Sequence, residues 1–319
     1  MKKTILALSA ALLTVISVNA QEGKPSVKVF SNFNYDLSAE EGENAFKEFE
    51  IKRSYLGYSY KFDDTFSAKI TFDVGSNDGG SAYTAFLKVA ALNWKASDNL
   101  SINFGQTGTK NFKFMEKAWG KRYINKSAQD KYKWANSADV GVTADYSLNE
   151  RLSLDAQILN GEGYKKTQST NGLFRGGLGI TYKVSNNLAL RLHHDVSPRA
   201  TYGENDASQA INSLALVYSK DNFTIGAEKN MMKNAGNILN EERELNSIYG
   251  DYSISDKYSI FGRYDDATKT EKETSYTVVG IERQMTKGVK VALNVQSDKG
   301  IEEGDEAMNT LYLNLEYKF

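Results

Sequence analysis

The sequence has no cysteine and two prolines among its 319 residues, and no long apolar run follows its first twenty positions. Without cysteine, disulfides cannot stabilise the fold. Without about 18 consecutive apolar residues after position 20, the mature chain has no membrane-spanning helix. The formal net charge of −1 is too small to favour nucleic-acid binding through an overall field.

The amino terminus has the pattern of an export signal. Lys2 and Lys3 precede an apolar stretch from Ile5 to Ile16, and Ala20 closes a small-residue cleavage site. The stretch is shorter than the ~20 apolar residues that a membrane anchor needs. We therefore expect residues 1–20 to be a cleaved signal peptide and residues 21–319 to form a single mature domain.

The carboxyl terminus alternates strictly between apolar and polar side chains. The apolar set is Leu311, Leu313, Leu315, Tyr317 and Phe319, and the polar set is Thr310, Tyr312, Asn314, Glu316 and Lys318. Similar alternation recurs along the chain, which predicts strands whose two faces meet different surroundings. Because lipid-facing and water-facing residues alternate, their hydropathies cancel, and the mean hydropathy of −0.50 is compatible with a membrane barrel.

Short turn signals divide the chain into hairpins. They lie at Asp63-Asp64, Asp98-Asn99, Asn149-Glu150, Asn186-Asn187, Asp221-Asn222, Asp256-Lys257 and Lys287-Gly288. Seven tight turns imply eight longer loops at the other end. The expected strands are 26–37, 49–62, 66–75, 83–96, 100–107, 139–148, 152–159, 174–184, 188–196, 211–220, 223–230, 246–254, 258–265, 274–284, 289–296 and 309–319. Sixteen strands, an even number, predict a closed antiparallel transmembrane β-barrel.

The alternation also assigns most strand faces. Val140, Val142, Ala144, Tyr146 and Leu148 are expected to face lipid, and Asp139, Thr143, Asp145 and Ser147 water. In residues 83–91 and 274–284 the pattern does not assign a face. Aromatic residues concentrate beside the tight turns and predict an interfacial girdle on the periplasmic side. Its members are Tyr58, Tyr60, Phe62, Phe66, Trp94, Tyr146, Tyr182, Tyr218, Phe223, Tyr252, Tyr258, Tyr317 and Phe319.

The third long loop, residues 107–137, is the candidate functional element because a loop of this length usually has a role. It carries eight basic residues against two acidic ones. Those expected to form a pore constriction are Lys110, Lys113, Lys117, Lys121, Arg122 and Lys126. Folded inward, with a short amphipathic helix around residues 112–119, the loop would narrow the lumen and concentrate small anions. The alternative is a solvated extracellular face, or one that binds lipopolysaccharide phosphates.

The expected lumen wall carries charges of both signs. The basic residues are Lys28, Arg53, Lys69, Arg175, Lys183, Arg191, Arg263, Lys290 and Lys318. The acidic residues are Asp36, Asp73, Asp145, Asp155, Asp195, Glu228, Asp265 and Glu316. This balance favours a transverse field across a general pore over a ladder of cations. Mixed charge is also what any hydrated barrel interior needs.

Several stretches resemble the phosphate-selective porin O/P family, as found in Bacteroidetes. They are Phe49-Glu50-Ile51-Lys52-Arg53 with Leu56-Gly57-Tyr58, Phe72-Asp73-Val74-Gly75, Phe104-Gly105-Gln106, Ala138-Asp139-Val140-Gly141-Val142, and Leu159-Asn160-Gly161-Glu162-Gly163-Tyr164. The resemblance covers most of the mature chain. It implies a sixteen-stranded outer-membrane pore, commonly trimeric, with an inward third loop. It also implies that Tyr317 and Phe319 resemble the terminal signal read by the barrel-assembly machinery.

Other functions have less support in the sequence. An outer-membrane enzyme needs a positioned base, and the two histidines are adjacent, so only His193 reaches the lumen, near Arg191 and Asp195. The acidic residues Asp298, Glu302, Glu303, Asp305 and Glu306 match no defined calcium loop. The glycine run 176–179 sits in an expected strand and suggests close packing rather than nucleotide binding. With no metal or cofactor motif, we expect a channel without a cofactor, and a non-conducting structural or adhesin barrel is the other alternative.

Overall fold

The computed structural model describes residues 23–76, 83–168, 172–198, 206–269, 272–300 and 306–319. The expected signal peptide, residues 1–20, lies outside these residues. None of the helices within the described ranges is long and apolar enough to cross a membrane.

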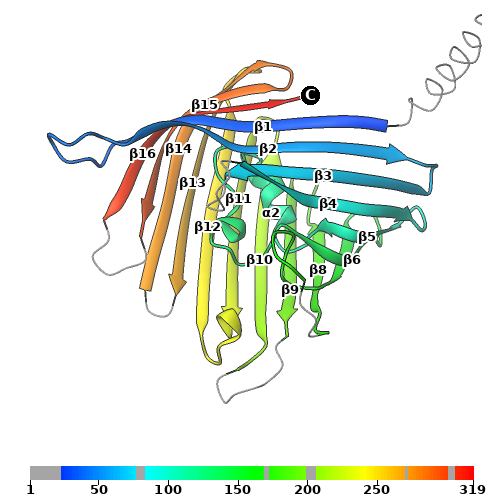
Figure 1. Ribbon diagram of the computed structural model, residues 1–319. Helices are drawn as coiled ribbons and strands as arrows, with labels where there is room; N and C mark the ends of the chain where they lie inside the picture. Colours follow the sequence, from blue (N-terminus) through cyan, green and yellow to red (C-terminus); the bar gives the residue numbers. More distant parts are fainter. Residues whose placement is uncertain (1–22, 77–82, 169–171, 199–205, 270–271, 301–305) are drawn as a thin grey trace, which may run out of the picture.

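Sixteen antiparallel strands close into one barrel (Figure 1). They are β1 (Gly23–Asp36), β2 (Lys47–Lys61), β3 (Phe66–Ser76), β4 (Tyr83–Lys95), β5 (Leu100–Gly108), β6 (Ala138–Ser147), β7 (Leu152–Leu159), β8 (Arg175–Lys183), β9 (Leu188–Ser197), β10 (Gln209–Lys220), β11 (Phe223–Lys233), β12 (Glu242–Ser253), β13 (Tyr258–Lys269), β14 (Lys272–Thr286), β15 (Val289–Lys299) and β16 (Ala307–Lys318). Each strand pairs with its sequence neighbours, and β1 pairs with β16 from Lys28↔Lys318 to Asp36↔Thr310. The predicted barrel and all sixteen predicted strands are confirmed.

The two faces of the strands follow the predicted alternation. On β6, Val142 and Tyr146 are exposed on the outer wall, whereas Asp139 and Thr143 are buried inside. On β16, Leu313 is 46% exposed and its neighbour Asn314 is fully buried. The interior therefore holds the polar side chains and the outer wall the apolar ones, as a barrel in lipid requires.

The seven predicted tight turns are confirmed, since each connects two paired strands across two to four residues. The girdle aromatics lie on the outer wall beside these turns, with Tyr58, Trp94 and Tyr252 all exposed. The expectation of eight longer loops is wrong at one connection. Strand β13 ends at Lys269 and β14 begins at Lys272, so that connection is as short as the turns.

Two β-bulges interrupt the alternation on the wall formed by β1 to β4. In β2, Phe30 pairs with Arg53 and Ser31 with Ile51, which leaves Lys52 as an extra residue. In β4, Thr71 pairs with Val89 and Phe72 with Leu87, so Lys88 is extra. A bulge turns two successive side chains towards one face. Lys52 and Arg53, and likewise Lys88 and Val89, therefore both point into the lumen.

The third loop lies inside the barrel, so the predicted inward position is confirmed. It contains α2 (Lys113–Trp119) and α3 (Ala128–Lys131), and Figure 1 shows α2 within the ring of strands. Met115 and Trp119, on one face of α2, are buried, as the predicted amphipathic helix requires. A further short 3₁₀ helix, η2 (Ala235–Asn237), follows β11.

Candidate pore constriction

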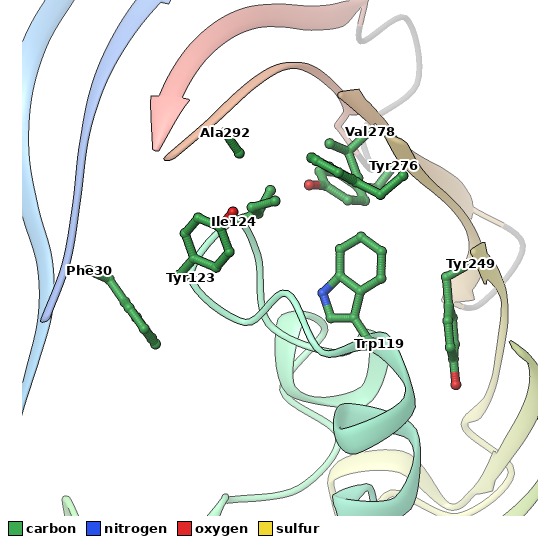
Figure 2. Close-up of a cluster of buried hydrophobic side chains, with 9 residues drawn as sticks. Phe30, Trp119, Tyr123, Ile124, Tyr249, Tyr276, Val278 and Ala292 are labelled. Atoms are coloured by element: carbon green, nitrogen blue, oxygen red, sulfur yellow. The ribbon is translucent and has the colours of Figure 1, made fainter. Parts of the chain in front are cut away.

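Three apolar clusters fix the third loop to one side of the lumen. In the first, Trp119, Tyr123 and Ile124 pack against Tyr276 and Val278 of β14 (Figure 2). The second joins loop and wall residues from β10 to β13, and the third does so at the start of the loop. The second contains Ala128, Trp134, Ile211, Met232, Leu245 and Ala267, and the third Phe112, Met115, Ala135 and Ala215. Apolar side chains on the inner wall thus provide the seat on which the loop rests.

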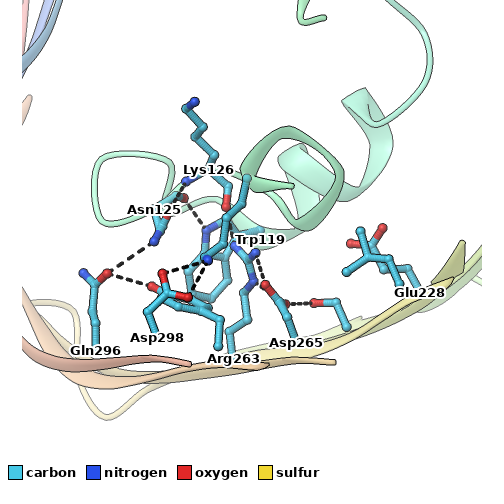
Figure 3. A network of polar contacts seen from close by, with 12 residues as sticks. Trp119, Asn125, Lys126, Glu228, Arg263, Asp265, Gln296 and Asp298 are labelled. Carbon is cyan, nitrogen blue, oxygen red and sulfur yellow. Dashed lines mark hydrogen bonds and ion pairs between the residues drawn. The ribbon is translucent and has the colours of Figure 1, made fainter. Parts of the chain in front are cut away.

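Hydrogen bonds between loop and wall reinforce this seat. The Gln129 amide donates to the Asn230 side chain at 2.7 Å and to Ser213 at 3.0 Å. The Tyr123 hydroxyl donates to Glu282 at 2.7 Å. The Arg263 guanidinium donates to the main-chain oxygen of Lys126 and pairs with Asp265 (Figure 3). These bonds satisfy polar groups that the loop would otherwise bury unpaired.

Three of the predicted wall arginines face inward but lie buried in ion pairs beneath the loop. Arg175 pairs with Asp195 at 2.5 Å, Arg191 with Asp155 at 2.6 Å, and Arg263 with Asp265. The Arg191 guanidinium also donates to the Lys110 main-chain oxygen at 2.8 Å. The structure thus gives these arginines a role in supporting the loop.

The glycine run on β8 explains how two side-chain contacts form between β7 and β9. The Asp155–Arg191 pair links β7 to β9 and crosses β8 beside Gly179, where a Cβ atom would lie 2.5 Å from Asp155 Oδ1. Gln157 reaches Asp195 at 2.7 Å in the same way, beside Gly177. Side chains from β7 and β9 can meet over β8 because these two positions carry no side chain.

Half of the predicted constriction cations are held in ion pairs. Lys110 is buried and pairs with Asp145 at 2.5 Å. Lys121 is buried and pairs with Asp251 at 2.6 Å and with Glu282 at 3.4 Å. Arg122 pairs with Glu116 and Asp130 of the loop itself. These three cations mainly fix the loop.

The other three form no ion pair with any residue that the structure describes. Lys113 and Lys117 are exposed on α2 towards the lumen, and Lys126 is half-buried. Burial lowers the pKa of Lys126, and the positive charges of Arg53 and Arg122 lower it further, while Asp130 opposes them. Lys126 thus lies among other positive charges that disfavour its own charged form.

A second group of cations gathers around Asp73 on β3, opposite the loop. Arg53 pairs with the Asp73 carboxylate at 2.8 Å, and the Lys88 ammonium lies 3.8 Å from it. The Tyr164 hydroxyl donates to the same carboxylate at 2.5 Å. Lys88 also lies over the rings of Tyr55 and Tyr164, 5.0 and 5.2 Å from their centres. One buried carboxylate thus organises two cations and one phenol.

Lys52 and Lys165 complete this group. Lys52 lies 5.7 Å from the centre of the Tyr312 ring, and Lys165 lies 4.7 Å from that of Phe86. Burial lowers the pKa of Lys165, and so do the charges of Arg53, Lys126 and Lys88, although Asp73 opposes them. From here on, the term constriction cations means Lys52, Arg53, Lys88, Lys126 and Lys165. This set shares only Lys126 with the constriction cations that were predicted from the sequence.

Sequence reasoning missed Lys52, Lys88, Tyr164 and Lys165 as pore residues. Lys52 and Lys88 occupy bulges, and strict alternation cannot place a bulged residue. Tyr164 and Lys165 belong to the loop after β7, which also folds inward. The Asp139 carboxylate accepts the Gly161 main-chain N–H there at 2.7 Å. The signal that was available is Gly161-Glu162-Gly163, which permits the sharp turn that this loop makes.

Two water-accessible cavities of the lumen lie on the side away from the loop's seat. One cavity of about 900 Å³, the vestibule, is lined by Lys24, Lys61, Lys69, Asn93, Lys110 and Lys113, with Asp63 and Asp64 at the turn. A second, of about 830 Å³, lies next to the constriction cations and shares Lys69. Its charged side chains are Lys28, Lys69, Lys88, Arg122, Lys287 and Lys318, with Glu116 as the acidic residue.

The structure places some residues of the alternative sites from the sequence. His193 is buried beneath the loop with Nδ1 3.3 Å from Arg191, and His194 points to the outer wall, where it bonds Asn212. No group of ligands suited to a metal ion occurs within the described ranges. Of the acidic stretch near residue 300, Asp298 binds Lys131 at 2.9 Å, and Glu302, Glu303 and Asp305 lie outside the described residues.

Solved structures with the same fold include outer-membrane proteins. An anion-selective porin from Comamonas acidovorans is 10% identical, with a TM-score of 0.71 over 93% of this chain and 99% of that chain. The outer membrane channel DcaP of Acinetobacter baumannii is 13% identical, with a TM-score of 0.69 over 93% and 97%. The trimer form of OmpT, an outer membrane protein of Vibrio cholerae, is 10% identical, with a TM-score of 0.62 over 93% and 99%.

No protein-family model matches the chain, and no curated protein matches its sequence. The likeness to solved structures therefore concerns the fold. In its closed sixteen-stranded sheet and its inward third loop, this chain has the barrel fold of outer-membrane porins.

Proposed function

We propose that this protein is an outer-membrane porin, a passive diffusion channel for small hydrophilic solutes with a mild preference for anions. The observation that carries the proposal is the excess of basic over acidic side chains around the two hydrated cavities. The 830 Å³ cavity is lined by six basic side chains and one acidic side chain, Glu116, and Lys113 and Lys117 on the loop form no ion pair with a described residue. Unpaired cations beside a hydrated path raise the local anion concentration.

The direct test is ion selectivity in a planar bilayer. Protein refolded or extracted as the mature chain is expected to give stepwise currents, with a reversal potential in a KCl gradient that indicates anion preference. The triple variant Lys52→Gln, Lys88→Gln and Lys126→Gln should shift that potential towards cations. Lys183→Gln removes one charge from a wall position that lines neither cavity and should shift it much less. Cation preference in the unmodified protein would exclude the proposal.

We also propose phosphate among the permeant anions, because of the resemblance to the phosphate-selective porin O/P family. Mixed-ion measurements with phosphate and chloride separate the two cases. A phosphate-selective channel would show chloride currents reduced by millimolar phosphate, and a general anion-preferring pore would show little effect. The constriction cations are mostly lysines, which act on phosphate as point charges rather than through bidentate bonds.

The rest of the biological setting belongs to the same proposal. Residues 1–20 would direct export, and Tyr317 with Phe319 would present the terminal signal to the barrel-assembly machinery. Membrane lipid and lipopolysaccharide would contact the outer wall, and the protein would form a homotrimer, in the way that OmpT of Vibrio cholerae has a trimer form. Cleavage after Ala20, mass measurement in detergent and a Phe319→Ser assembly assay test these parts separately.

Assays on the same purified protein distinguish the porin from two alternatives, an outer-membrane enzyme and a non-conducting structural or adhesin barrel. An enzyme would hydrolyse peptide or phospholipid, yet His193 is buried and contacts arginine, which disfavours its action as a base. A structural or adhesin barrel would give no current. The two cavities of about 900 and 830 Å³ favour the channel over a filled lumen.

A further inference from the structure

The 830 Å³ cavity next to the constriction is amphipathic. Its cations share the cavity with the apolar side chains of Phe30, Tyr55 and Val89. Phe30 and Tyr55 form an edge-to-face pair with ring centres 5.8 Å apart. Val89 points inward because Lys88 is the bulged residue of β4, so the same irregularity supplies a charge and an apolar surface side by side.

Apolar wall is not needed for the passage of inorganic ions. Water against an apolar surface is unfavourable, and an ion with a full hydration shell gains nothing from contact with a ring or a valine. Sites for small organic molecules, in contrast, combine an apolar surface with a few precisely placed polar groups. The cavity combines both features. Lys88 lies 5.0 Å from the centre of the Tyr55 ring, and Val89 is its neighbour.

From this arrangement we propose that the cavity is a binding site for small organic anions that carry an aromatic or other apolar body, such as aromatic carboxylates. The anionic group lies between Lys69 and Lys88, and the body lies against Phe30, Tyr55 and Val89. Glu116 is engaged by Arg122, which leaves the lysines to meet the ligand. This inference rests on the proposed porin function and names a substrate class for it.

Current block by three probes separates charge from apolar contact. Benzoate has the charge and the ring, acetate the charge alone and benzamide the ring alone. Benzoate is expected to half-block the current at a concentration about tenfold lower than acetate, since one or two buried carbon groups contribute about that factor. Benzamide should not block. Equal half-blocking concentrations for benzoate and acetate would overturn the inference and leave an anion-preferring pore intact.

Two variants test whether the organic anion binds in the 830 Å³ cavity. Val89→Thr keeps the side-chain volume and should reduce the benzoate-to-acetate ratio at least about threefold, because it puts a hydroxyl where the ring binds. Lys69→Gln should raise the half-blocking concentrations of both anions, whereas Lys183→Gln should leave them unchanged. An unchanged ratio in Val89→Thr would overturn the assignment to this cavity. Absence of any current from the folded, unmodified barrel would instead refute the porin function itself.

Discussion

Gln157 on β7 and Asp195 on β9 are joined by a hydrogen bond of 2.7 Å although β8 lies between them. Gly177, the residue of β8 at that level, leaves room for the contact, and Gly179 does the same for Asp155 and Arg191. Asp195 also binds Arg175, and the Gln157 side-chain oxygen accepts the main-chain N–H of Lys110 at 2.7 Å. The start of the third loop is thus fixed by a network that depends on two missing side chains.

Gly179→Ala is expected to lower the stability of the barrel. A methyl group there would lie 2.5 Å from Asp155 Oδ1 and 2.6 Å from Arg191 Nη2, so the ion pair must move apart. Loss of satisfied buried partners costs about 1–3 kcal/mol. The measurement is the temperature at which the folded barrel unfolds, read from its electrophoretic mobility. Gly176→Ala is the matched control, since a Cβ at that position meets nothing within 4 Å. Equal unfolding temperatures would contradict the explanation.

Trp119→Ala should loosen the third loop and enlarge the pore. Trp119 is 3% exposed and makes edge contacts with Tyr249 and Phe261, at 6.0 and 6.2 Å between ring centres. Removal of such a side chain costs about 3–5 kcal/mol of packing. We expect a larger and noisier single-channel current. Trp94→Ala, on the outer wall, tests the general effect of losing a tryptophan and should leave the current unchanged.

Two lysines of the loop are expected to respond differently to charge reversal. Lys117 is exposed and without an ion pair among the described residues, so Lys117→Glu should shift selectivity towards cations while the unfolding temperature stays constant. Lys121 is buried between Asp251 and Glu282, so Lys121→Glu would place three carboxylates together and lower the unfolding temperature strongly. If both variants changed selectivity alone, the anchoring role of Lys121 would be wrong.

Anion preference should decline at alkaline pH earlier than ordinary lysines would allow. Burial and neighbouring cations lower the pKa of Lys126 and of Lys165 below the usual 10.5. A cation with a lowered pKa loses its charge at a lower pH, so the preference falls as the pH rises through these lowered pKa values, before it reaches 10.5. Reversal potentials measured from pH 7 to pH 10.5 follow this loss. In the double variant Lys126→Gln and Lys165→Gln the loss of anion preference should begin at a higher pH than in the unmodified protein.

Tyr164→Phe tests the second inward loop. The variant keeps the ring beneath Lys88 and Lys165 but removes the hydrogen bond to Asp73. Without this donor the loop after β7 should move more freely, and we expect increased current noise with little change in selectivity. Tyr132→Phe is a suitable control, because no hydrogen bond of the Tyr132 hydroxyl occurs within the described part of the chain. A shift in selectivity without added noise would argue against a holding role for Tyr164.

The barrel was predictable from sequence because one physical requirement acts at every strand. Backbone groups in lipid must pair, and side chains must alternate between lipid and water. The two stretches without a clear face fail for identifiable reasons. Residues 83–91 contain the bulge at Lys88, and residues 274–284 contain Tyr276 and Val278, apolar residues that face inward to seat the loop.

The candidate site was less predictable. Its basic loop was identified by length and charge, but pairing depends on which residues meet in space. Nothing local to Lys121 indicates that it meets Asp251 and Glu282, more than a hundred residues away. Equally, nothing local to Lys126 indicates that it lacks such a partner. Selectivity therefore depends on the residual charge after long-range pairing, which composition alone does not give.

Because the third loop rests mainly on the wall from β9 to β15, the cavities of about 900 and 830 Å³ are lined chiefly by β1 to β5. Most residues that support the loop and most residues that a solute would meet thus belong to different stretches of the chain. Substitutions in the first hundred residues can retune what passes through while the support for the loop stays intact. Such a division would let the lining of the cavities change from one related barrel to another without loss of the loop's support.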